Sequence, residues 1–437
     1  MTSIKEESWE GSAPSLTIGL VGLGYVGLPV AVSFAEKYKV IGYDVNQKRV
    51  DQLSRHQDIT GEVTREQLKK SSIHFTTEEE YLNTCGFIIV AVPTPISDDL
   101  EPDLTAIKKA SAVIGRNLSK GTIVVYESTV YPGTTEDVCI PILQQNSQLK
   151  AGSDFFVGYS PERINPGDKI HTFKTINKVV ASQDKVSLEK ITHVYQSILE
   201  AEVYQAPSIK VAEASKVVEN TQRDINIAYM NELSHIFHYM NIDTYQVLEA
   251  ANTKWNFLPF IPGLVGGHCI GVDPYYLIHQ SKKFGYEPSF LISARKLNDS
   301  MPAFITQSLI QRIIKEKMNV SNLKVAVMGV TFKENIPDLR NSKALKIVEL
   351  LKDYNIDVTV CDPAASEEEL AALGITAVSM ADLQPSDIVI LAVSHDVFRH
   401  LSKQQLKKLM KSEASVLVDL KGVLNGDILD TFNVWRL

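Results

Sequence analysis

Residues 16–34 read LTIGLVGLGYVGLPVAVSF, and this stretch decides the fold. Its first six residues form a short, mostly apolar run that predicts a buried β-strand, and the apolar stretch after Gly27 predicts a helix. Three glycines with the spacing GxGxxG stand between them. Gly22 permits a tight turn, Gly24 lets a pyrophosphate approach the backbone, and Gly27 allows the helix to pack closely on the strand. Because the first N–H groups of a helix attract phosphate, the stretch predicts a dinucleotide-binding βαβ unit.

An acidic residue follows at the spacing that such a unit requires. The next predicted strand ends at Asp44, 20 residues beyond Gly24. A carboxylate at this position accepts hydrogen bonds from the ribose hydroxyls and repels the additional phosphate of NADP, so it favours NAD as the cofactor. Two alternatives stay open at this point: FAD as the cofactor, and a glycine turn that only packs the helix against the strand.

The remaining sequence alternates short apolar runs with helical patterns, which is typical of parallel βαβ units. Strands are predicted at 16–21, 40–44, 73–76, 87–92, 122–128 and 155–160, and again at 323–330, 357–363, 387–393 and 416–420. Residues 208–258 contain no glycine or proline, and their apolar residues recur at helical spacing, which predicts one long helix and a second one. The second β/α region reaches Gly329 without completing a GxGxxG, so we expect it to bind a different ligand or part of one. The predicted fold class is α/β, with two Rossmann-like doubly wound parallel-sheet domains joined by a long central helix.

The composition of the 437-residue chain is that of a globular protein with two or three domains, with 44% apolar and 22% charged residues. A net charge of −8 without a dense Lys/Arg run argues against nucleic acid as a partner. The four cysteines lack the spacing of zinc sites, so we expect neither a metal nor disulfides. No segment approaches the ~18 apolar residues of a membrane span or has the apolar core of a signal peptide, which predicts a cytoplasmic protein.

One cysteine has unusual neighbours. Cys269 lies in IPGLVGGHCIGVDPYYL, beside His268 and four residues before Asp273. Glycines let substrate and cofactor approach the sulfur, and a thiolate can attack an aldehyde to form a thiohemiacetal. The sequence leaves open whether Cys269 is such a nucleophile or a buried spectator, because thiol activation depends on the surroundings in space. The other cysteines are expected in the core: Cys85, Cys139 and Cys361.

Two further groups of polar residues are candidates for a site. Lys216, in VAEASKVVENTQRDIN, shares a helix face with Asn220 and Arg223, four and seven residues later. The alternative is a solvated helix face. Glu162 and Arg163 follow the predicted strand at 155–160, at the edge where α/β folds place ligands, with a surface ion pair as the alternative.

Taken together, GLGYVG, Asp44, SPER, the AEASKVVEN helix and GGHCIGVDPYY resemble the UDP-glucose/GDP-mannose dehydrogenase family, from residue 16 nearly to the C-terminus. Within it, the segments ESTVYPGTTED, FLPFIPGLVGGHCIGVDPYYL and TFKENIPDLRNS most resemble the UDP-N-acetylhexosamine 6-dehydrogenases that supply uronic acids for bacterial surface polysaccharides. UDP-glucose dehydrogenases typically have Ser before the cysteine and Lys before the aspartate, where this chain has His268 and Val272.

The resemblance implies a four-electron oxidation of the C6 alcohol of UDP-GlcNAc or UDP-GalNAc to a carboxylate, with two NAD+ and no metal. Cys269 corresponds to the nucleophile that carries first a thiohemiacetal and then a thioester. Lys216 corresponds to the lysine that stabilises oxyanions, and Asp273 to the aspartate that works with an ordered water. Glu162 corresponds to the glutamate of thioester hydrolysis, and Asn220 completes the implied catalytic set.

The resemblance also implies two sets of ligand contacts. The residues matched to NAD contacts are Gly22, Gly24, Tyr25, Val26, Gly27, Asp44, Arg49, Thr94, Thr129 and Arg340. The residues matched to UDP-sugar contacts are Glu162, Arg163, Lys216, Asn220, Arg223, Gly266, Phe332, Lys333 and Lys421.

The predicted domains are an N-terminal tail at 1–15, an NAD-binding Rossmann domain at 16–207, a central helical region at 208–315, and a UDP-sugar-binding Rossmann-like domain at 316–437. The central region is expected to carry the catalytic lysine and cysteine and to build a homodimer or a higher homo-oligomer. The alternatives are a UDP-glucose or UDP-ManNAc 6-dehydrogenase, a β-hydroxyacid dehydrogenase that makes one NADH per substrate, and a catalytically silent NAD-binding or sugar-sensing protein. A silent protein is expected to lack Cys269 or Lys216, and both are present.

Overall fold

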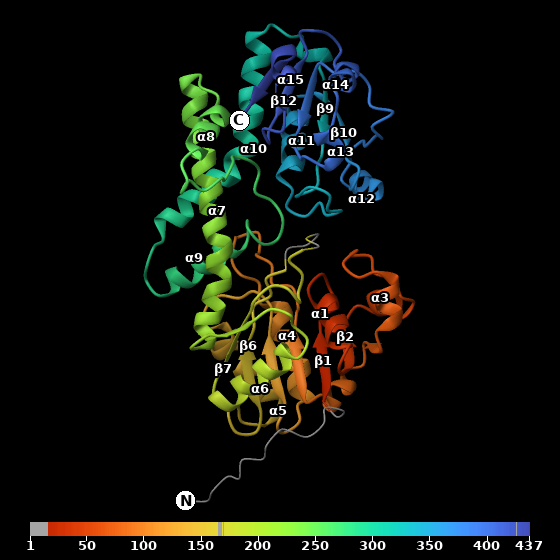
Figure 1. Cartoon of the computed structure of the whole chain (residues 1–437), viewed down its shortest axis with the longest axis vertical. Helices are drawn as coiled ribbons and strands as arrows, with labels where there is room; N and C mark the ends of the chain where they lie inside the picture. Colours follow the sequence, from red (N-terminus) through yellow and green to blue (C-terminus); the bar gives the residue numbers. More distant parts are fainter. Residues whose placement is uncertain (1–15, 165–167, 169, 425) are drawn as a thin grey trace, which may run out of the picture. The chain divides into compact units, whose positions relative to one another are not determined.

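Two β-sheets organise the computed structural model, which describes residues 16–164, 168, 170–424 and 426–437 (Figure 1). The predicted tail at 1–15 lies outside the described residues. The chain divides into two compact units, the first ending at Val217 and the second beginning at Val218. The predicted α/β fold class with two doubly wound sheets is confirmed.

The sheet of the first unit has the order β3-β2-β1-β4-β5-β6-β7-β8 among the described residues. Neighbouring strands are parallel except for the antiparallel pair β6 and β7. The chain order reverses between the neighbouring strands β1 and β4, and such a switch point is where open α/β sheets bind ligands. The strands are β1 (Thr17–Val21), β2 (Lys39–Tyr43), β3 (Ile73–Thr76), β4 (Phe87–Val90), β5 (Ile123–Tyr126), β6 (Phe156–Tyr159), β7 (Lys178–Ser182) and β8 (Val203–Gln205).

Six of these strands correspond to the predicted apolar runs, whereas β7 and β8 were not predicted. β4 and β5 are buried along their whole length, which explains their continuous apolar sequences FIIV and IVVY. β8 is short and mostly exposed, so its sequence lacks that signal. The helical elements of this unit are α1 (Gly27–Phe34), α2 (Gln47–Ser54), α3 (Arg65–Lys70), η1 (Glu79–Thr84), α4 (Thr105–Arg116), η2 (Thr135–Cys139), α5 (Ile140–Ser147) and α6 (Lys185–Gln196).

The long helix predicted after Pro207 is present as α7 (Ile209–Met240), and the second one is α8 (Thr244–Asn252). α7 has 32 residues and contains the boundary between the two units. The remaining helical elements of the second unit are α9 (Asp273–Lys283), α10 (Ser289–Lys315), η3 (Val320–Asn322), α11 (Lys343–Asp353), α12 (Glu367–Ala372), α13 (Asp396–Arg399), α14 (Lys403–Leu409) and α15 (Asp427–Thr431).

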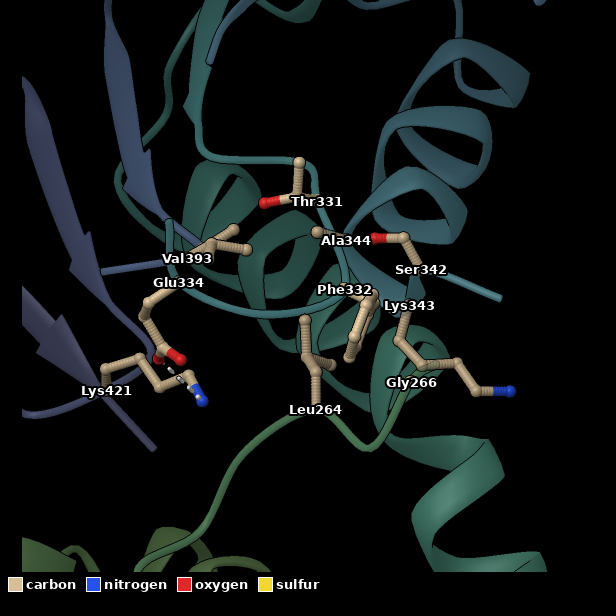
Figure 2. Close-up of a pocket in the computed structure, with 11 residues that line it drawn as sticks. Leu264, Gly266, Thr331, Phe332, Glu334, Ser342, Lys343, Ala344, Val393 and Lys421 are labelled. Atoms are coloured by element: carbon tan, nitrogen blue, oxygen red, sulfur yellow. Dashed lines mark ion pairs between the residues drawn. The ribbon is translucent and has the colours of Figure 1, made fainter. Parts of the chain in front are cut away.

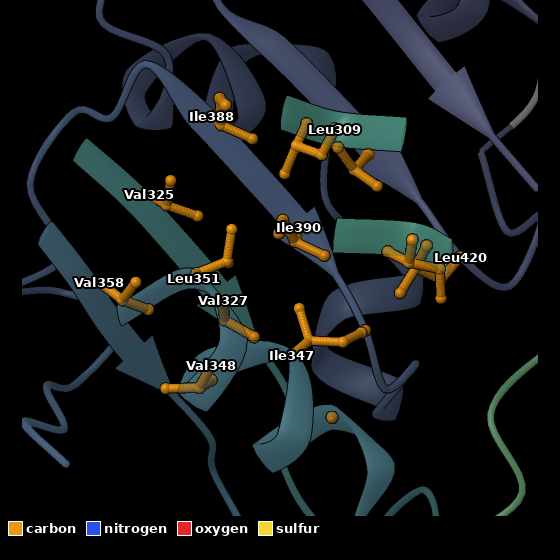
Figure 3. Packing of buried hydrophobic residues seen from close by; sticks show 14 of the residues in the cluster. Leu309, Val325, Val327, Ile347, Val348, Leu351, Val358, Ile388, Ile390 and Leu420 are labelled. Carbon is orange, nitrogen blue, oxygen red and sulfur yellow. The ribbon is translucent and has the colours of Figure 1, made fainter. Parts of the chain in front are cut away.

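The sheet of the second unit has the order β10-β9-β11-β12-β13, and each neighbouring pair is parallel. Its core is a cluster of buried valine, isoleucine and leucine side chains, among them Val327 of β9, Ile390 of β11 and Ile347 of α11 (Figure 3). The strands are β9 (Lys324–Met328), β10 (Asp357–Cys361), β11 (Ile388–Leu391), β12 (Val416–Asp419) and β13 (Asn433–Arg436). The edge strand β13 was not predicted, because its half-buried residues NVWR form no apolar run.

A buried carboxylate connects α7 with the rest of the first unit. Glu213 is fully buried, and its carboxylate oxygens accept hydrogen bonds from the backbone N–H groups of Gly133 (2.5 Å) and Thr135 (2.8 Å). Burial raises the pKa of Glu213 from 4.5 to about 7, although the two N–H donors act in the opposite direction. The contact between the start of η2 and the first part of α7 is therefore made by a carboxyl group that titrates near neutral pH.

We expect the stability advantage of the wild type over Glu213→Gln to shrink as pH rises. Between the unfolded pKa of 4.5 and the folded pKa of about 7, the native state holds a proton that the unfolded state has released. The contribution of Glu213 to the free energy of unfolding is therefore fully present below pH 4.5 and is lost as the pH rises through about 7. The total loss is up to about 3 kcal/mol. Urea unfolding of both proteins from about pH 5 to about pH 8 measures the difference, and other titrating groups cancel in the comparison. Parallel pH profiles would contradict the assignment.

Candidate active site

The glycine loop joins β1 to α1 and is tightly packed at two glycines and open at the third. Gly22 has a φ of +96°, and a Cβ added there would lie 2.6 Å from the carbonyl oxygen of Ala91. A Cβ on Gly27 would lie 1.8 Å from the carbonyl oxygen of Gly22. A Cβ on Gly24 would meet nothing within 4 Å, and this residue is exposed. The loop thus presents bare backbone at Gly24, beside the half-buried Tyr25 and Val26, and this surface suits a pyrophosphate.

Asp44 and Arg49 brace this loop from the end of β2. The Leu23 N–H donates to Asp44 Oδ2 (2.9 Å), and the Asn46 N–H donates to Asp44 Oδ1 (2.9 Å). Arg49 is buried, donates from Nε to the carbonyl oxygen of Leu23 (2.8 Å), and forms an ion pair with Asp58 (2.8 Å). Asp44 remains half-buried, so its carboxylate can still face a ribose. Direct contact of Arg49 with NAD stays a prediction.

Thr94 and Thr129 lie together after two neighbouring strands. Thr94 follows β4, Thr129 follows β5, and the Thr94 hydroxyl donates to the carbonyl oxygen of Thr129 (2.6 Å). With Gly24 after β1 and Asp44 after β2, four predicted NAD contacts therefore occupy the carboxyl edge of one parallel sheet. The residues present fit a dinucleotide. Arg340, matched to the same cofactor, is exposed and belongs to the second unit.

Glu162 lies in a buried network of charges that includes two residues the sequence did not mark. Its Oε1 accepts hydrogen bonds from the N–H groups of Arg163 (2.7 Å) and Ile164 (2.8 Å), and its Oε2 accepts one from Lys178 Nζ (2.6 Å). Lys178 is itself 3% exposed and forms a second ion pair with Glu127 Oε1 (3.1 Å). One buried ammonium group thus serves two buried carboxylates.

Burial and the neighbouring charges both shift the pKa values within this network. Burial raises the pKa of Glu127, although Lys178 acts in the opposite direction. The pKa of Lys178 is raised, because the attraction of Glu127 and Glu162 outweighs its burial. In the sequence, Lys178 is only a lysine at the start of the apolar strand KVVAS. A strand that begins at the protein surface has the same pattern, so the sequence does not show that this lysine is buried.

Helix α7 carries three predicted site residues in different surroundings. Lys216 is half-buried, and no hydrogen bond or ion pair of its ammonium group is found within the part of the chain that the structure describes. One turn later, Asn220 is buried, and its Nδ2 donates to Asp273 Oδ2 (2.5 Å). Arg223 is exposed, so its contact with substrate stays a prediction.

Cys269 is fixed at the start of α9. Its carbonyl oxygen accepts hydrogen bonds from the N–H groups of Val272 (3.0 Å) and Asp273 (2.8 Å), and Asp273 is the first residue of that helix. The Cys269 side chain is half-buried, and its Sγ lies 3.1 Å from Nδ1 of His268. Unit two therefore brings Cys269, Asp273 and Asn220 into one connected group.

The other three cysteines are buried, as predicted, and burial raises the pKa of each thiol. The values are about 11 for Cys85, about 12 for Cys139 and about 11 for Cys361. Neutral buried thiols of this kind are poor nucleophiles, which leaves Cys269 as the accessible thiol of the chain.

A pocket at the carboxyl edge of the second sheet contains three of the predicted substrate contacts. Gly266, Phe332 and Lys421 line it, and Figure 2 shows Lys421 paired with Glu334 on one side (3.5 Å). Lys333, the next residue after Phe332, is half-buried and does not line the pocket. The pocket also has lining residues that the sequence did not mark: Leu264, Thr331, Glu334, Ser342, Lys343, Ala344, Ala392 and Val393.

The second sheet has an aspartate where the first has Asp44, but this aspartate is used internally. Asp362 follows β10, and its side chain is fully buried. Its Oδ2 accepts the N–H groups of Val330 (2.6 Å) and Thr331 (3.0 Å) and lies 3.1 Å from Nε2 of the buried His395. Burial would raise its pKa, but His395 and the backbone donors lower the pKa of Asp362 to about 2. With its carboxylate occupied by these groups, Asp362 is less available to a ribose than the half-buried Asp44 of the first unit.

The described residues contain no group of three or more His, Cys, Asp or Glu side chains placed to hold a metal ion. Within the same residues, no helix combines the length and the apolar character that a membrane span requires.

Three segments of the chain match one family. Residues 16–199 match the NAD binding domain of the UDP-glucose/GDP-mannose dehydrogenase family, residues 210–300 its central domain, and residues 326–426 its UDP binding domain. The chain therefore belongs to this family and is an NAD-dependent oxidoreductase. The resemblance predicted from the sequence motifs is confirmed, as is NAD as the cofactor.

Individual relatives cover nearly the whole chain. Protein CapL of Staphylococcus aureus is 50% identical over 422 residues, which are 96% of this chain and 99% of the relative. The UDP-N-acetyl-D-glucosamine 6-dehydrogenase of Pseudomonas aeruginosa is 50% identical over 417 residues, which are 95% and 99%. Among solved structures, the UDP-D-ManNAc dehydrogenase of Pyrococcus horikoshii superposes with a TM-score of 0.85 at 28% identity, covering 96% of this chain and 99% of that one.

The packing of the glycine loop predicts different effects for two alanine substitutions. Gly27→Ala places a methyl group against the Gly22 carbonyl oxygen, so we expect it to lower the free energy of unfolding by about 1–3 kcal/mol and to abolish NAD+ binding. Gly24→Ala meets no neighbour, so we expect an unchanged thermal midpoint but NAD+ affinity weaker by about tenfold, because the methyl group occupies the surface that the pyrophosphate approaches. Thermal unfolding and calorimetric NAD+ titration measure both effects. Wild-type NAD+ affinity in Gly24→Ala would contradict this location of the pyrophosphate.

Proposed function

We propose that this chain oxidises C6 of a UDP-N-acetylhexosamine, UDP-GlcNAc or UDP-GalNAc, to the carboxylate, and so supplies a uronate for surface polysaccharide synthesis. The observation that carries the proposal is a half-buried thiol, Cys269, fixed to the start of α9 in a chain that also has an NAD cradle. A one-step alcohol dehydrogenase has no use for such a thiol. Selectivity for UDP-GlcNAc or UDP-GalNAc over UDP-ManNAc is supported by 50% identity to a UDP-N-acetyl-D-glucosamine 6-dehydrogenase, against 30% for the UDP-N-acetyl-D-mannosamine dehydrogenase of Pyrococcus horikoshii.

NAD+, when bound, supplies the hydride acceptor for both oxidation steps. The loop at Gly22, Gly24 and Gly27 would hold its pyrophosphate, and Asp44 would accept hydrogen bonds from its adenosine ribose. Thr94 and Thr129, at the ends of β4 and β5, stand on the same sheet edge and would contact the rest of the cofactor.

Cys269 retains the half-oxidised sugar. Its thiolate adds to the C6 aldehyde, so that a C–S bond forms and the carbonyl oxygen becomes the hydroxyl of a thiohemiacetal. Loss of the second hydride and of the hydroxyl proton leaves a thioester. Water then attacks the thioester carbon, the C–S bond breaks, and the carboxylate leaves while the thiol is restored. Covalent capture prevents release of a reactive aldehyde between the two steps.

Three polar residues act on the charges that develop around this carbon. The Lys216 ammonium group is half-buried and can stabilise the oxyanions of addition and hydrolysis. The hydrogen bond from Asn220 to Asp273 fixes both side chains, so Asp273 can orient a water and Asn220 the sugar. Glu162 already accepts three hydrogen bonds, which fix the orientation of its carboxylate. This suits electrostatic orientation of the hydrolytic water better than removal of its proton.

NADH yield per sugar tests both the reaction class and the substrate. We expect two NADH for each UDP-GlcNAc or UDP-GalNAc consumed, and much slower turnover of UDP-glucose and UDP-ManNAc. Absorbance of NADH with limiting amounts of each UDP-sugar gives the ratio. Cys269→Ser is the control, and we expect it to lose turnover by roughly a thousandfold or more. One NADH per sugar would reject the four-electron reaction, and normal output from Cys269→Ser would reject the thiol as nucleophile.

We also propose that a second copy of the chain covers an apolar stripe on α7. Val218, Tyr229, Ile236 and Met240 recur at spacings of eleven, seven and four residues, which place them along one side of the helix. Their side chains are between 43% and 59% exposed, although apolar side chains in such a row are normally buried. An isologous contact would cover the same stripe on both copies.

Charge introduced into this stripe should break the dimer. We expect Ile236→Asp to change the molar mass measured by light scattering from that of two chains to that of one at micromolar concentration, because a buried unpaired carboxylate is costly. Ile314→Asp is the matched control, since Ile314 is an exposed isoleucine on α10, outside the stripe. A dimer that persists in Ile236→Asp, or one lost in both variants, would contradict the proposed interface.

A further inference from the structure

The residue next to Cys269 makes a contact that the proposed function does not use. Nδ1 of His268 lies 3.1 Å from Sγ of Cys269, at hydrogen-bonding distance for a thiol. The His268 side chain is 33% exposed, so solvent and small molecules can reach the pair. Adjacent residues seldom direct their polar atoms at each other, because neighbouring side chains usually diverge along the backbone. Here the glycine at 267, with a φ of +78°, precedes the pair and turns the chain.

A carboxylate from a distant part of the sequence faces the other ring nitrogen. Nε2 of His268 is 3.9 Å from Oδ2 of Asp338, which is an ion-pair distance. The Asp338 side chain is only 4% exposed, so this attraction is weakly screened by solvent. The pKa of Asp338 is lowered, because Arg340 and His268 outweigh the effect of its burial. Asp338 is therefore a permanent negative charge beside the imidazole.

We propose that His268 is the base that generates the Cys269 thiolate and that Asp338 positions and stabilises its protonated form. This inference rests on the proposed role of Cys269 as the nucleophile. The nearby carboxylate favours the His268 tautomer that carries its proton on Nε2, and this leaves the Nδ1 lone pair directed at the sulfur. Thiol, imidazole and carboxylate then stand in the order that activates cysteine nucleophiles in other enzymes.

The proton balance of the step is complete within these groups. The S–H proton moves from Cys269 to Nδ1, which leaves a thiolate beside an imidazolium whose two positive N–H groups face the sulfur and Asp338. When the thiolate forms the C–S bond with the aldehyde carbon, the carbonyl oxygen gains the electron pair. The Nδ1 proton passes to that oxygen to complete the thiohemiacetal, and His268 is neutral again. The step needs no oxidant or additional acid.

Other groups around the imidazole limit the size of the effect. Arg340 donates hydrogen bonds to Asp338 from Nε (3.0 and 3.1 Å) and Nη2 (2.6 Å), so its positive charge offsets part of the attraction between Asp338 and an imidazolium. The Phe332 ring, 6.0 Å from the imidazole between ring centroids, adds an apolar neighbour without charge. We therefore expect a moderate lowering of the thiol pKa, in contrast to the extreme values of the most acidic protein thiols.

The rate of Cys269 alkylation by iodoacetamide, followed by peptide mass spectrometry across pH, tests the proposal without substrate or cofactor. In the wild type, we expect the rate to rise with an apparent pKa below the ordinary ~8.5 of a free thiol. In His268→Gln and His268→Ala, we expect the profile to move up by about one pH unit, so that alkylation near pH 7 slows by about tenfold. Asp338→Asn should move it in the same direction by less. The three buried cysteines serve as internal controls for unfolding.

Turnover across pH provides a second readout that a merely structural role would not affect. We expect the NADH rate of His268→Gln to fall near neutral pH and to recover towards the wild-type rate at alkaline pH, where the thiol ionises without a base. Unchanged alkylation and rate profiles in His268→Gln and His268→Ala would overturn the role of His268. If Cys269→Ser is inactive in that case, the proposed function still stands. If Cys269→Ser forms two NADH per sugar, the nucleophile assignment fails, and the inference about His268 fails with it.

Discussion

Buried polar contacts along α7 fix the register of the one helix that both units share. Glu213 binds backbone N–H groups of the first unit, and Asn220 binds Asp273 of the second. One turn further on, Asp224 pairs with Arg295, and Asn231 exchanges hydrogen bonds with Gly263. A buried polar group left without its partner costs about 1–3 kcal/mol, so a rotation or slip of the helix would break several of these contacts at once. The position of Asn220, which makes one of these contacts, and that of Lys216, which lies between Glu213 and Asn220, follow from this constraint.

The two sheets use the same architecture for different purposes, and the difference lies in how two aspartates are employed. Asp44 accepts one hydrogen bond from Leu23 of the glycine loop and one from Asn46, and it stays half-buried, which leaves acceptor capacity for a ribose. The Asp362 side chain is fully buried, and its oxygens accept hydrogen bonds from the loop backbone and face His395. The same residue type at the same strand end is thus partly accessible in one sheet, where it is predicted to contact NAD, and bound up in internal contacts in the other. A glycine pattern alone does not separate the two cases.

Much of the fold could be predicted from the sequence, because it rests on local patterns. Continuous apolar runs such as FIIV identify buried parallel strands, and the absence of glycine and proline over 208–258 identifies α7 and α8. β7 and β13 were missed because a lysine, an asparagine and an arginine interrupt their apolar character. In the candidate site, the residues within sequence motifs were found, whereas Lys178 and Asp338 were not. Each meets its partner only through the tertiary fold, sixteen residues from Glu162 and seventy from His268.

On the proposed function and the role inferred for His268, the cofactor cradle and the base of the thiol belong to different units. The cradle consists of Gly24, Asp44, Thr94 and Thr129, all in the first unit, whereas Cys269, His268 and Asp338 belong to the second. A four-electron oxidation must exchange NADH for a second NAD+ while the sugar remains bound. The base proposed for the thiol shares no residue with the cofactor cradle, because His268 contacts Cys269 Sγ and faces Asp338 within the second unit. The residues that would bind NAD+ and release NADH are therefore different from those that would activate the sulfur.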